Sequence, residues 1–243
     1  MARFRLFALI AVLALAPGCG EDEKAAPTEP SSAGDGSGGT VAVAALGDSI
    51  TSGSPLYDPD PEAQATLGFG DDERSQFEYW AAEAEPSLEF ENCGVFGERT
   101  DEIAQRLSEC AEGNKVMIVQ GGINDIAQGL SGGPDAALDA ASQAAANIDG
   151  MLAETEEMGL EVAVANVLPW NNGHPVADDP IDQLNADIQE IAKRRGVPVL
   201  DFYDALEDPD MAGVMAPEFT DDGDHPSIEG YEVLGELVAR ELD

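Results

Sequence analysis

The sequence predicts an α/β fold in which a parallel sheet carries helices on both faces. Two patterns and one bulk property lead to this prediction. Five short apolar segments have the length of strands, and stretches with helical periodicity separate them. The chain has 243 residues, of which 43% are hydrophobic, so it can build one sizeable core. Alternating strands and helices of this kind favour a parallel sheet covered by helices.

Each predicted strand is a short apolar run, except that the second is only half apolar. The strands are VAVAAL (41–46), SLEFENC (87–93), KVMIVQGG (115–122), LEVAVANVLP (160–169) and VPVLDF (197–202). Right-handed crossovers would place the carboxyl ends of these strands on one edge of the sheet, where such folds bind ligands.

The predicted helices lie between these strands and after the last one. They cover residues around 74–85, about 100–112, an Ala-rich segment from Asp135, 180–195 and the end of the chain. The Ala-rich helix has one apolar face and is expected to stop at Gly159. That face contains Leu138, Ala141, Ala145, Ile148 and Leu152. The last helix has another such face, formed by Ile228, Tyr231, Leu234, Leu237 and Val238.

The first 39 residues are expected to lie outside this domain, which covers 40–243. Arg3 and Arg5 precede an apolar run, so residues 1–18 have the pattern of an export signal. That run is too short to span a membrane comfortably. Residues 19–39 are rich in Pro, Ser, Gly and acid, which is typical of a flexible tether.

Cys19 follows the sequence LAPG, which resembles the lipobox of bacterial lipoproteins. The resemblance implies that Cys19 carries lipid and anchors an exported protein at the periplasmic or cell surface. Membrane contact would then come only through this anchor. In the alternative, cleavage occurs nearby, Cys19 is incidental and the protein is secreted.

The formal net charge of −38 excludes several kinds of partner. Nucleic acid and anionic lipid surfaces both require clusters of Lys and Arg, so we expect neither to bind here. The acidity is typical of a solvated surface and says little about the substrate. We expect a monomer.

With Cys19 assigned to lipid, Cys93 and Cys110 form an even pair in an oxidising compartment. A disulfide between them would stabilise the fold by about 3 kcal/mol in the chain-entropy model. Two buried thiols are the alternative.

Four polar segments follow predicted strand ends or precede the last helix. They are GDSIT (47–51), NCGVFGERT (92–100), GGIND (121–125) and DDGDHP (221–226). Acyl transfer needs a serine and a base that titrates near neutrality, and the chain has only two histidines. His225 lies three residues after Asp222, so a turn can bring that carboxylate to the ring. Gly97 and Asn124 offer N–H donors to an oxyanion.

These blocks, in this order, resemble those of the SGNH hydrolases, also called the GDSL esterase/lipase family. The resemblance implies a flavodoxin-like three-layer α/β/α sandwich and no metal or organic cofactor. It implies that Ser49 is the nucleophile and that Asp222 and His225 complete the triad. The implied oxyanion hole consists of the N–H of Ser49, the N–H of Gly97 and the amide of Asn124.

Other assignments remain open. Ser131 in GLSGG matches a nucleophile elbow but no strand runs into it, so a loop is favoured. His174 has no acid three residues before it, and Trp170 beside it is expected either to line the pocket or simply to pack. Asp221 and Asp224 are alternatives to Asp222.

Gly94 is an alternative to Gly97, which only the family spacing favours.

Residues 221–226 do not match a calcium-binding loop, because Pro226 falls where a ligand is needed. Residues 53–75 are expected to be an irregular acidic insertion, either a lid or specificity loop or a solvated loop without a role.

The sequence therefore predicts a serine esterase for short-acyl or lysophospholipid-like esters that works through an acyl-enzyme. Small apolar residues near the motifs, such as Ile50, Val95 and Ile123, favour short acyl chains. The alternative substrate is an O-acetylated envelope or extracellular polysaccharide. A binding module or a structural lipoprotein is less favoured, because binding alone does not require the full set of five residues.

Overall fold

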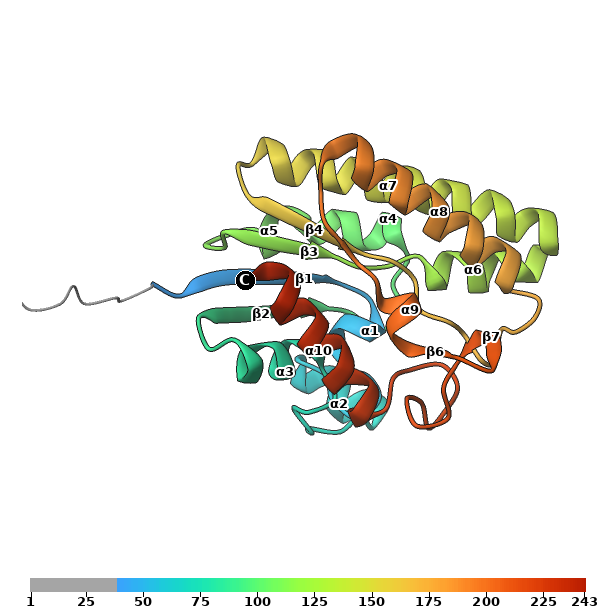
Figure 1. The fold of residues 1–243 in the computed structure, drawn as a ribbon, viewed down its shortest axis with the longest axis horizontal. Helices are drawn as coiled ribbons and strands as arrows, with labels where there is room; N and C mark the ends of the chain where they lie inside the picture. The colour runs from blue at the N-terminus through green and yellow to red at the C-terminus, as the bar shows by residue number, and fades with distance from the viewer. Residues whose placement is uncertain (1–38) are drawn as a thin grey trace, which may run out of the picture. The chain divides into compact units, whose positions relative to one another are not determined.

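A computed structural model describes residues 39–243 and places a parallel sheet between two layers of helices (Figure 1). The predicted export signal, Cys19 and nearly all of the predicted tether lie outside these residues. Within 39–243, no helix is both long and apolar enough to cross a membrane.

The sheet of the described domain has five parallel strands in the order β2-β1-β3-β4-β5, which is the flavodoxin-like order. The strands are β1 (Val41–Gly47), β2 (Leu88–Gly94), β3 (Val116–Val119), β4 (Glu161–Ala165) and β5 (Val199–Leu200). Gly47 pairs with Gly94 and Leu46 pairs with Val119, so the three strands β2, β1 and β3 end nearly level. From β1 the chain goes to β2 on one side, and from β2 it crosses β1 to β3 on the other side. The order of the strands therefore reverses at β1, and ligands of such sheets bind at the carboxyl ends of the strands at this point.

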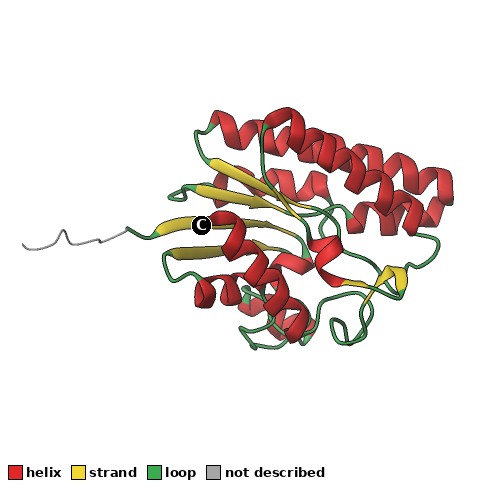
Figure 2. Ribbon diagram, viewed as in Figure 1, coloured by secondary structure: helices red, strands yellow, loops and turns green. Residues whose placement is uncertain are grey.

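Helices cover both faces of the sheet (Figure 2). The helices are α1 (Ser49–Ser52), α2 (Pro61–Leu67), α3 (Phe77–Ala84), α4 (Thr100–Ile103), η1 (Ala104–Arg106), α5 (Leu107–Cys110), α6 (Ile123–Gly129), η2 (Leu130–Gly132), α7 (Pro134–Glu157), α8 (Asp178–Arg195), α9 (Phe202–Leu206) and α10 (Ile228–Leu242). Helices α4 to α8 cover one face, and α1, α3, α9 and α10 cover the other. The predicted three-layer α/β/α sandwich is confirmed.

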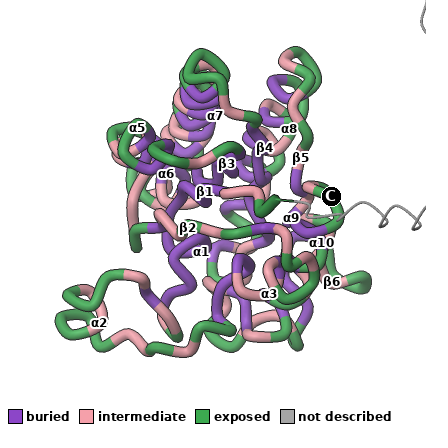
Figure 3. Tube along the Cα trace, turned by 90° about the vertical axis from the view of Figure 1, so that its left-hand side faces the viewer, coloured by how far each residue is buried: buried purple, intermediate pink, exposed green. Residues whose placement is uncertain are grey.

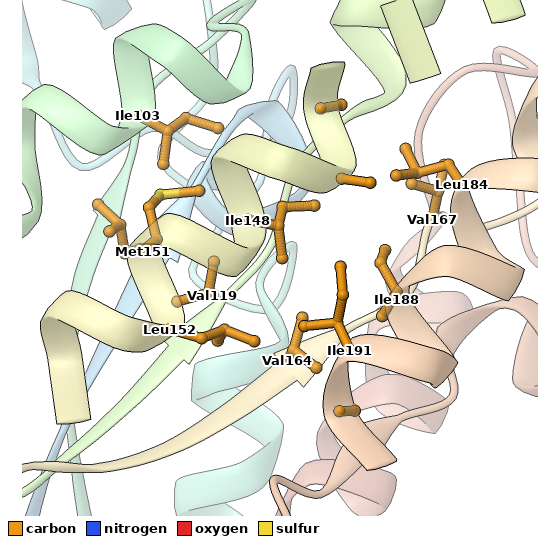
Figure 4. Close-up of a cluster of buried hydrophobic side chains, with 14 of the residues drawn as sticks. Ile103, Val119, Ile148, Met151, Leu152, Val164, Val167, Leu184, Ile188 and Ile191 are labelled. Atoms are coloured by element: carbon orange, nitrogen blue, oxygen red, sulfur yellow. The ribbon is translucent and has the colours of Figure 1, made fainter. Parts of the chain in front are cut away.

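Alternate residues of β1 belong to opposite cores. Ala44 and Leu46 join the cluster with α7 and α8, whereas Val43 and Ala45 join the cluster with α3 and α10. Figure 4 shows the first cluster, where Ile148 and Leu152 of α7 face Val164 of β4. A strand that is buried on both faces must be apolar throughout, which explains the uninterrupted apolar run at this point in the sequence.

The structure differs from the sequence-based expectation in several elements. The helix expected over 100–112 is divided into α4, η1 and α5, and the fifth strand is reduced to two residues because Asp201 caps α9. A short antiparallel pair, β6 (Glu207–Asp208) and β7 (Met211–Met215), was not anticipated. The insertion at 53–75 contains α2, which begins where the side chain of Asp60 accepts a hydrogen bond from the N–H of Glu62.

Cys93 at the end of β2 and Cys110 at the end of α5 are joined by a disulfide, with their Cα atoms 6.2 Å apart. The bond connects an edge strand of the sheet to the helical layer on one face. Cys93 lies two residues before the loop that carries Val95, Phe96 and Gly97, so the cross-link fixes the strand from which this loop emerges.

Candidate active site

Ser49 lies at the first position of α1, directly after β1. Asp48 caps this helix, because its Oδ1 accepts a hydrogen bond from the N–H of Ile50 at 2.9 Å. The carbonyl oxygen of Ser49 accepts a hydrogen bond from the N–H of Gly53, whose φ of 92° ends the helix after one turn. Ser49 is only 5% exposed. The apolar strand that the sequence predicts therefore holds the serine in a rigid, nearly buried turn at the edge of the sheet.

Two residues that sequence reasoning missed hold this turn from neighbouring strands. The side-chain oxygen of Gln120, just after β3, accepts hydrogen bonds from the N–H of Asp48 at 3.2 Å and from Thr51 Oγ1 at 2.9 Å. The Nδ2 of Asn92 in β2 donates to the carbonyl oxygen of Thr51 at 2.9 Å. Both contacts join positions far apart in the sequence, so local patterns carry no signal for them.

His225 faces Ser49. The distance from His225 Nε2 to Ser49 Oγ is 3.2 Å, and the distance from His225 Nδ1 to Asp222 Oδ2 is 2.8 Å. With Nδ1 donating to the carboxylate, Nε2 is the nitrogen that can accept the serine proton. The predicted serine, histidine and aspartate thus form one continuous hydrogen-bonded chain.

Asp222 is the carboxylate that orients the ring. Partial burial raises its pKa, but a hydrogen bond from the His225 ring and bonds from the N–H groups of His225 and Asp224 outweigh this, so the pKa is lowered. The carboxylate therefore stays ionised beside the imidazole. Asp224 instead accepts hydrogen bonds from Trp170 Nε1 at 2.6 Å and Asn172 Nδ2 at 2.8 Å. Asp221 is exposed at the start of the turn.

The two predicted side donors of the oxyanion hole lie beside the serine. Gly97 and Asn124 both line the cavity that contains Ser49 and His225. The amide nitrogen of Asn124 donates one hydrogen to the carbonyl oxygen of Glu98 at 2.9 Å, and its second hydrogen is available to a substrate. The hydrogen bond to Glu98 also ties Asn124 to the loop that carries Gly97.

Gly94 and Gly97 are required for different structural reasons. A Cβ atom at Gly94 would lie 2.0 Å from the backbone nitrogen of Ser52, so this glycine lets β2 pack against α1. Its N–H already donates to the side-chain oxygen of Asn92 at 2.9 Å. Gly97 has a φ of 78°, which favours glycine, and a Cβ there would meet nothing within 4 Å. The structure thus separates the two glycines that the sequence left as alternatives.

Arg106 is a further residue whose contribution the sequence did not reveal. Its guanidinium donates to the carbonyl oxygens of Cys93 at 2.6 Å and Gly47 at 3.0 Å, and it pairs with Glu98 at 2.7 Å. Arg106 therefore supplies hydrogen bonds to the carbonyl oxygens at the ends of β1 and β2. Through Glu98 it also holds the loop that joins β2 to α4.

Asp48 is fully buried beside the serine. Burial raises the pKa of its carboxyl group to about 6, although the hydrogen bond from the N–H of Ile50 acts in the opposite direction. Its second oxygen, Oδ2, has no hydrogen-bond partner among residues 39–243. The neutral and the ionised forms of this side chain are therefore close to each other in free energy near neutral pH.

The cavity at this site has a volume of about 200 Å³. Its lining residues are Ser49, Ile50, Phe96, Gly97, Ile123, Asn124, Ala127, Trp170, Asp224 and His225. A larger hollow of about 460 Å³ lies at the opposite, amino-terminal ends of the strands, next to Val116, Leu160 and Arg195. Neither a histidine nor Ser49 lines that hollow, so its larger size does not make it the candidate active site.

The competing candidates lie elsewhere. Ser131 is exposed in η2 and donates to the carbonyl oxygen of Gln128 at 2.7 Å. His174 Nδ1 lies 2.9 Å from Asp178 Oδ2. Neither Ser131 nor His174 lines the cavity at Ser49. In the part of the chain that the structure covers, no group of three or more His, Cys, Asp or Glu side chains could hold a metal ion.

Comparison with known proteins shows to which family the chain belongs. The model of the GDSL-like lipase/acylhydrolase family matches residues 45–233, which contain every residue of the site. The chain belongs to this family. It is an enzyme that hydrolyses ester bonds. None of the curated proteins compared matches the chain significantly.

Solved structures similar to this GDSL-like acylhydrolase share its fold. A protein assigned to the G-D-S-L lipolytic family, from Desulfitobacterium hafniense, is 21% identical, with a TM-score of 0.64 over 83% of this chain and 99% of that one. A variant of an acetyl xylan esterase from Geobacillus stearothermophilus is 20% identical, with a TM-score of 0.64 over 84% and 95%. A lipase/acylhydrolase from Enterococcus faecalis is 21% identical, with a TM-score of 0.60 over 84% and 95%.

Proposed function

We propose that this acylhydrolase is a serine esterase for short-acyl esters, with Ser49 as nucleophile, His225 as general base and acid, and Asp222 as the group that orients it. One observation carries the proposal: the hydrogen-bonded chain from Ser49 Oγ to His225 at 3.2 Å and from His225 to Asp222 at 2.8 Å. A serine hydroxyl is a weak nucleophile unless a neighbouring base removes its proton, and this arrangement supplies that base.

The reaction proceeds in two halves. Ser49 Oγ forms a bond to the ester carbonyl carbon as its proton passes to His225 Nε2, and the carbonyl oxygen becomes an oxyanion. The carbon–oxygen bond to the alcohol then breaks, and the imidazolium gives its proton to the departing alcohol oxygen. His225 Nε2 then takes a proton from a water molecule as the water oxygen bonds to the acyl carbon. The bond from that carbon to Ser49 Oγ breaks, the imidazolium returns the proton to Oγ, and the acid is released.

The developing negative charge is held by three N–H donors in this scheme. The backbone of Ser49 and the backbone of Gly97 supply two of them, and the second amide hydrogen of Asn124 supplies the third. Loss of one such donor costs about 3–4 kcal/mol of transition-state stabilisation in comparable enzymes.

The size and lining of the cavity support a small acyl group. About 200 Å³ is enough for a short chain but lies below the range of drug-sized pockets. Ile123 and Ala127 on α6 contribute apolar side chains to the lining of the cavity.

A fluorophosphonate probe tests the nucleophile directly, because it reacts with activated serines. We expect labelling of the wild-type domain and release of p-nitrophenol from its acetate ester, and loss of both in Ser49→Ala. Ser131→Ala is the matched control and should behave as the wild type. Labelling that persists in Ser49→Ala, or that disappears in Ser131→Ala, would contradict the assignment.

A second candidate substrate, an O-acetylated carbohydrate, is favoured by the polar and aromatic rim of the site. Trp170 lines the cavity, and its indole is fixed by Asp224, which also accepts a hydrogen bond from Asn172. Aromatic rings and carboxylates at a pocket mouth suit polyhydroxylated alcohols. The likeness to an acetyl xylan esterase is an analogy of fold. Acetate release from acetylated xylo-oligosaccharides, compared with acetate release from ethyl acetate, distinguishes the two candidates.

We also propose that the enzyme is exported and anchored through lipid on Cys19, and that the domain acts as a monomer. Incorporation of radiolabelled palmitate into the full chain, and its loss in Cys19→Ser, tests the anchor. Unlabelled wild-type chain in a membrane-free supernatant would instead identify a secreted enzyme. Light scattering of the domain tests the monomer.

A further inference from the structure

Residues 54–74 form an arm that begins where the nucleophile turn ends. Ser54 Oγ lies 2.8 Å from Ser52 Oγ, and Ser75 Oγ donates to the carbonyl oxygen of Gly53 at 2.9 Å, which closes the base of the arm. Further along, the N–H of Gly70 donates to the carbonyl oxygen of Pro55 at 3.0 Å. The arm is therefore a closed, hydrogen-bonded loop attached to the turn that carries Ser49.

The outer part of the arm contributes little to the protein core. Helix α2 has no buried residue, and Figure 3 shows it projecting to one side of the sheet and helices. Leu67 at the end of this helix is 52% exposed. Core packing therefore does not explain why the arm takes this position.

One apolar side chain of the arm returns to the active site. The ring of Phe69 packs edge-on against the ring of Phe96, with their centroids 5.0 Å apart. Phe96 lies next to Gly97, lines the cavity and is 43% exposed. Its ring centroid is 6.3 Å from that of His225. Phe69 and Phe96 thus form a continuous aromatic wall that begins beside the imidazole.

The chemistry determines which part of the ester this wall contacts. The departing alcohol oxygen must lie within reach of His225 Nε2 to receive its proton. The group attached to that oxygen therefore leaves the site past the imidazole, where Phe96 lies. The acyl group is then left with the remainder of the cavity, which Ile123 and Ala127 also line.

Charge restricts the alcohol further. The acidic residues of the arm that are not buried are Asp60, Glu62, Asp71, Asp72 and Glu73. The single cation of the arm, Arg74, is paired with Asp72 at 2.6 Å. An alcohol with a negative charge would be repelled from this surface.

We propose that Phe69 and Phe96 bind the alcohol part of the substrate and select an uncharged alcohol with a flat apolar face. This inference rests on the proposed esterase activity. Two kinds of alcohol present such a face: an aromatic ring and the carbon–hydrogen face of a sugar ring. Phe69 is a specificity residue for either, and it also positions Phe96.

The test compares acetate esters that differ only in the alcohol: benzyl acetate, an acetylated methyl xyloside and ethyl acetate. Phe69→Ala should lower kcat/KM for benzyl acetate, the xyloside or both by about three- to tenfold, as expected for the loss of one aromatic contact. The value for ethyl acetate should change by less than about twofold, because ethanol has no flat face. Phe69→Tyr should restore the wild-type values. Leu67→Ala, on the same arm, is the matched control and should change none of them.

The outcomes separate this inference from the function on which it rests. A loss confined to benzyl acetate identifies an aromatic alcohol, and a loss that includes the xyloside identifies a sugar; both support the wall. Equal losses on all three esters, or no loss, overturn it while leaving the esterase intact. A changed ratio of ethyl butyrate to ethyl acetate places the wall on the acyl side and also overturns it. A wild-type enzyme inactive on every ester overturns both proposals.

Discussion

Ser49 is 5% exposed, whereas the side chain of Asp222, at the other end of the same hydrogen-bonded chain, is 40% exposed. The serine turn is held by residues of neighbouring strands and packs into the core. The histidine turn lies nearer the surface and is held partly by its own side chains. Asp222 Oδ1 accepts from the N–H groups of Asp224 and His225, and Thr220 Oγ1 donates to the carbonyl oxygen of His225.

The difference separates two ways of fixing a site. The position of Ser49, the proposed nucleophile, is coupled to the stability of the whole sheet, so changes around it should affect folding and activity together. His225 and Asp222, the proposed acid–base pair, lie in a surface turn. Asn172, in the loop after β4, donates hydrogen bonds to the Asp222 carbonyl and the Asp224 carboxylate of this turn. Changes there should affect activity with little cost in stability.

The largest expected effect lies in the histidine turn. Asp222→Asn should lower kcat by about 10³- to 10⁴-fold, because an amide favours the wrong tautomer of the imidazole. Asp224→Asn, two residues away, should lower kcat by about tenfold or less, since Asp224 contacts Trp170 and Asn172 and not the ring. Steady-state hydrolysis of p-nitrophenyl acetate measures both, and equal losses would show that the two carboxylates share the role.

On the serine side, the buried carboxyl of Asp48 should make stability depend on pH. Its pKa is raised from 3.8 to about 6, so the folded state holds its proton more tightly than the unfolded chain. The resulting stabilisation is fully present below about pH 4 and is lost as the pH rises through 6, by about 3 kcal/mol.

Asp48→Asn removes this dependence, because an amide oxygen can still accept the hydrogen bond from Ile50 and carries no charge. The free energy of unfolding of the variant relative to wild type should therefore rise by about 2.5 kcal/mol between pH 4 and pH 7, which is most of the full effect. Urea unfolding at both pH values measures it. A constant difference across this range would show that the Asp48 carboxyl titrates at its ordinary pKa in the folded state.

The fold could be predicted from the sequence because its pattern is local. Apolar runs mark the central strands, which are buried on both faces, and three of the four motifs lie at or just after strand ends, while the fourth precedes the last helix. The resemblance to a known family, and not periodicity, predicted that Ser49, Gly97, Asn124, Asp222 and His225 would meet. Four of these residues line one cavity in the structure, and the fifth, Asp222, is hydrogen-bonded to the His225 ring outside it. Their catalytic roles remain predictions.

The supporting residues could not be predicted, for a physical reason. Gln120 contacts Asp48 across 72 positions of the chain, and Asn92 contacts Thr51 across 41. Such partners are set by the register of the sheet, which periodicity does not reveal. The contact of Phe69 with Phe96 is hidden in the same way, because an irregular acidic insertion gives no indication of where the ring of Phe69 will lie.

The smallest expected effects come from two residues that support the serine turn and the histidine turn. Gln120→Ala leaves the N–H of Asp48 and the hydroxyl of Thr51 without their acceptor in a buried turn, and should destabilise the domain by about 2 kcal/mol while also lowering kcat. Asn172→Ala removes two hydrogen bonds to the exposed histidine turn. It should lower kcat, but it should cost less than about 1 kcal/mol of stability, because water can replace both bonds. Urea unfolding and kcat, measured on both variants, test the distinction. An equal loss of stability in the two would show that the histidine turn is as firmly built into the fold as the serine.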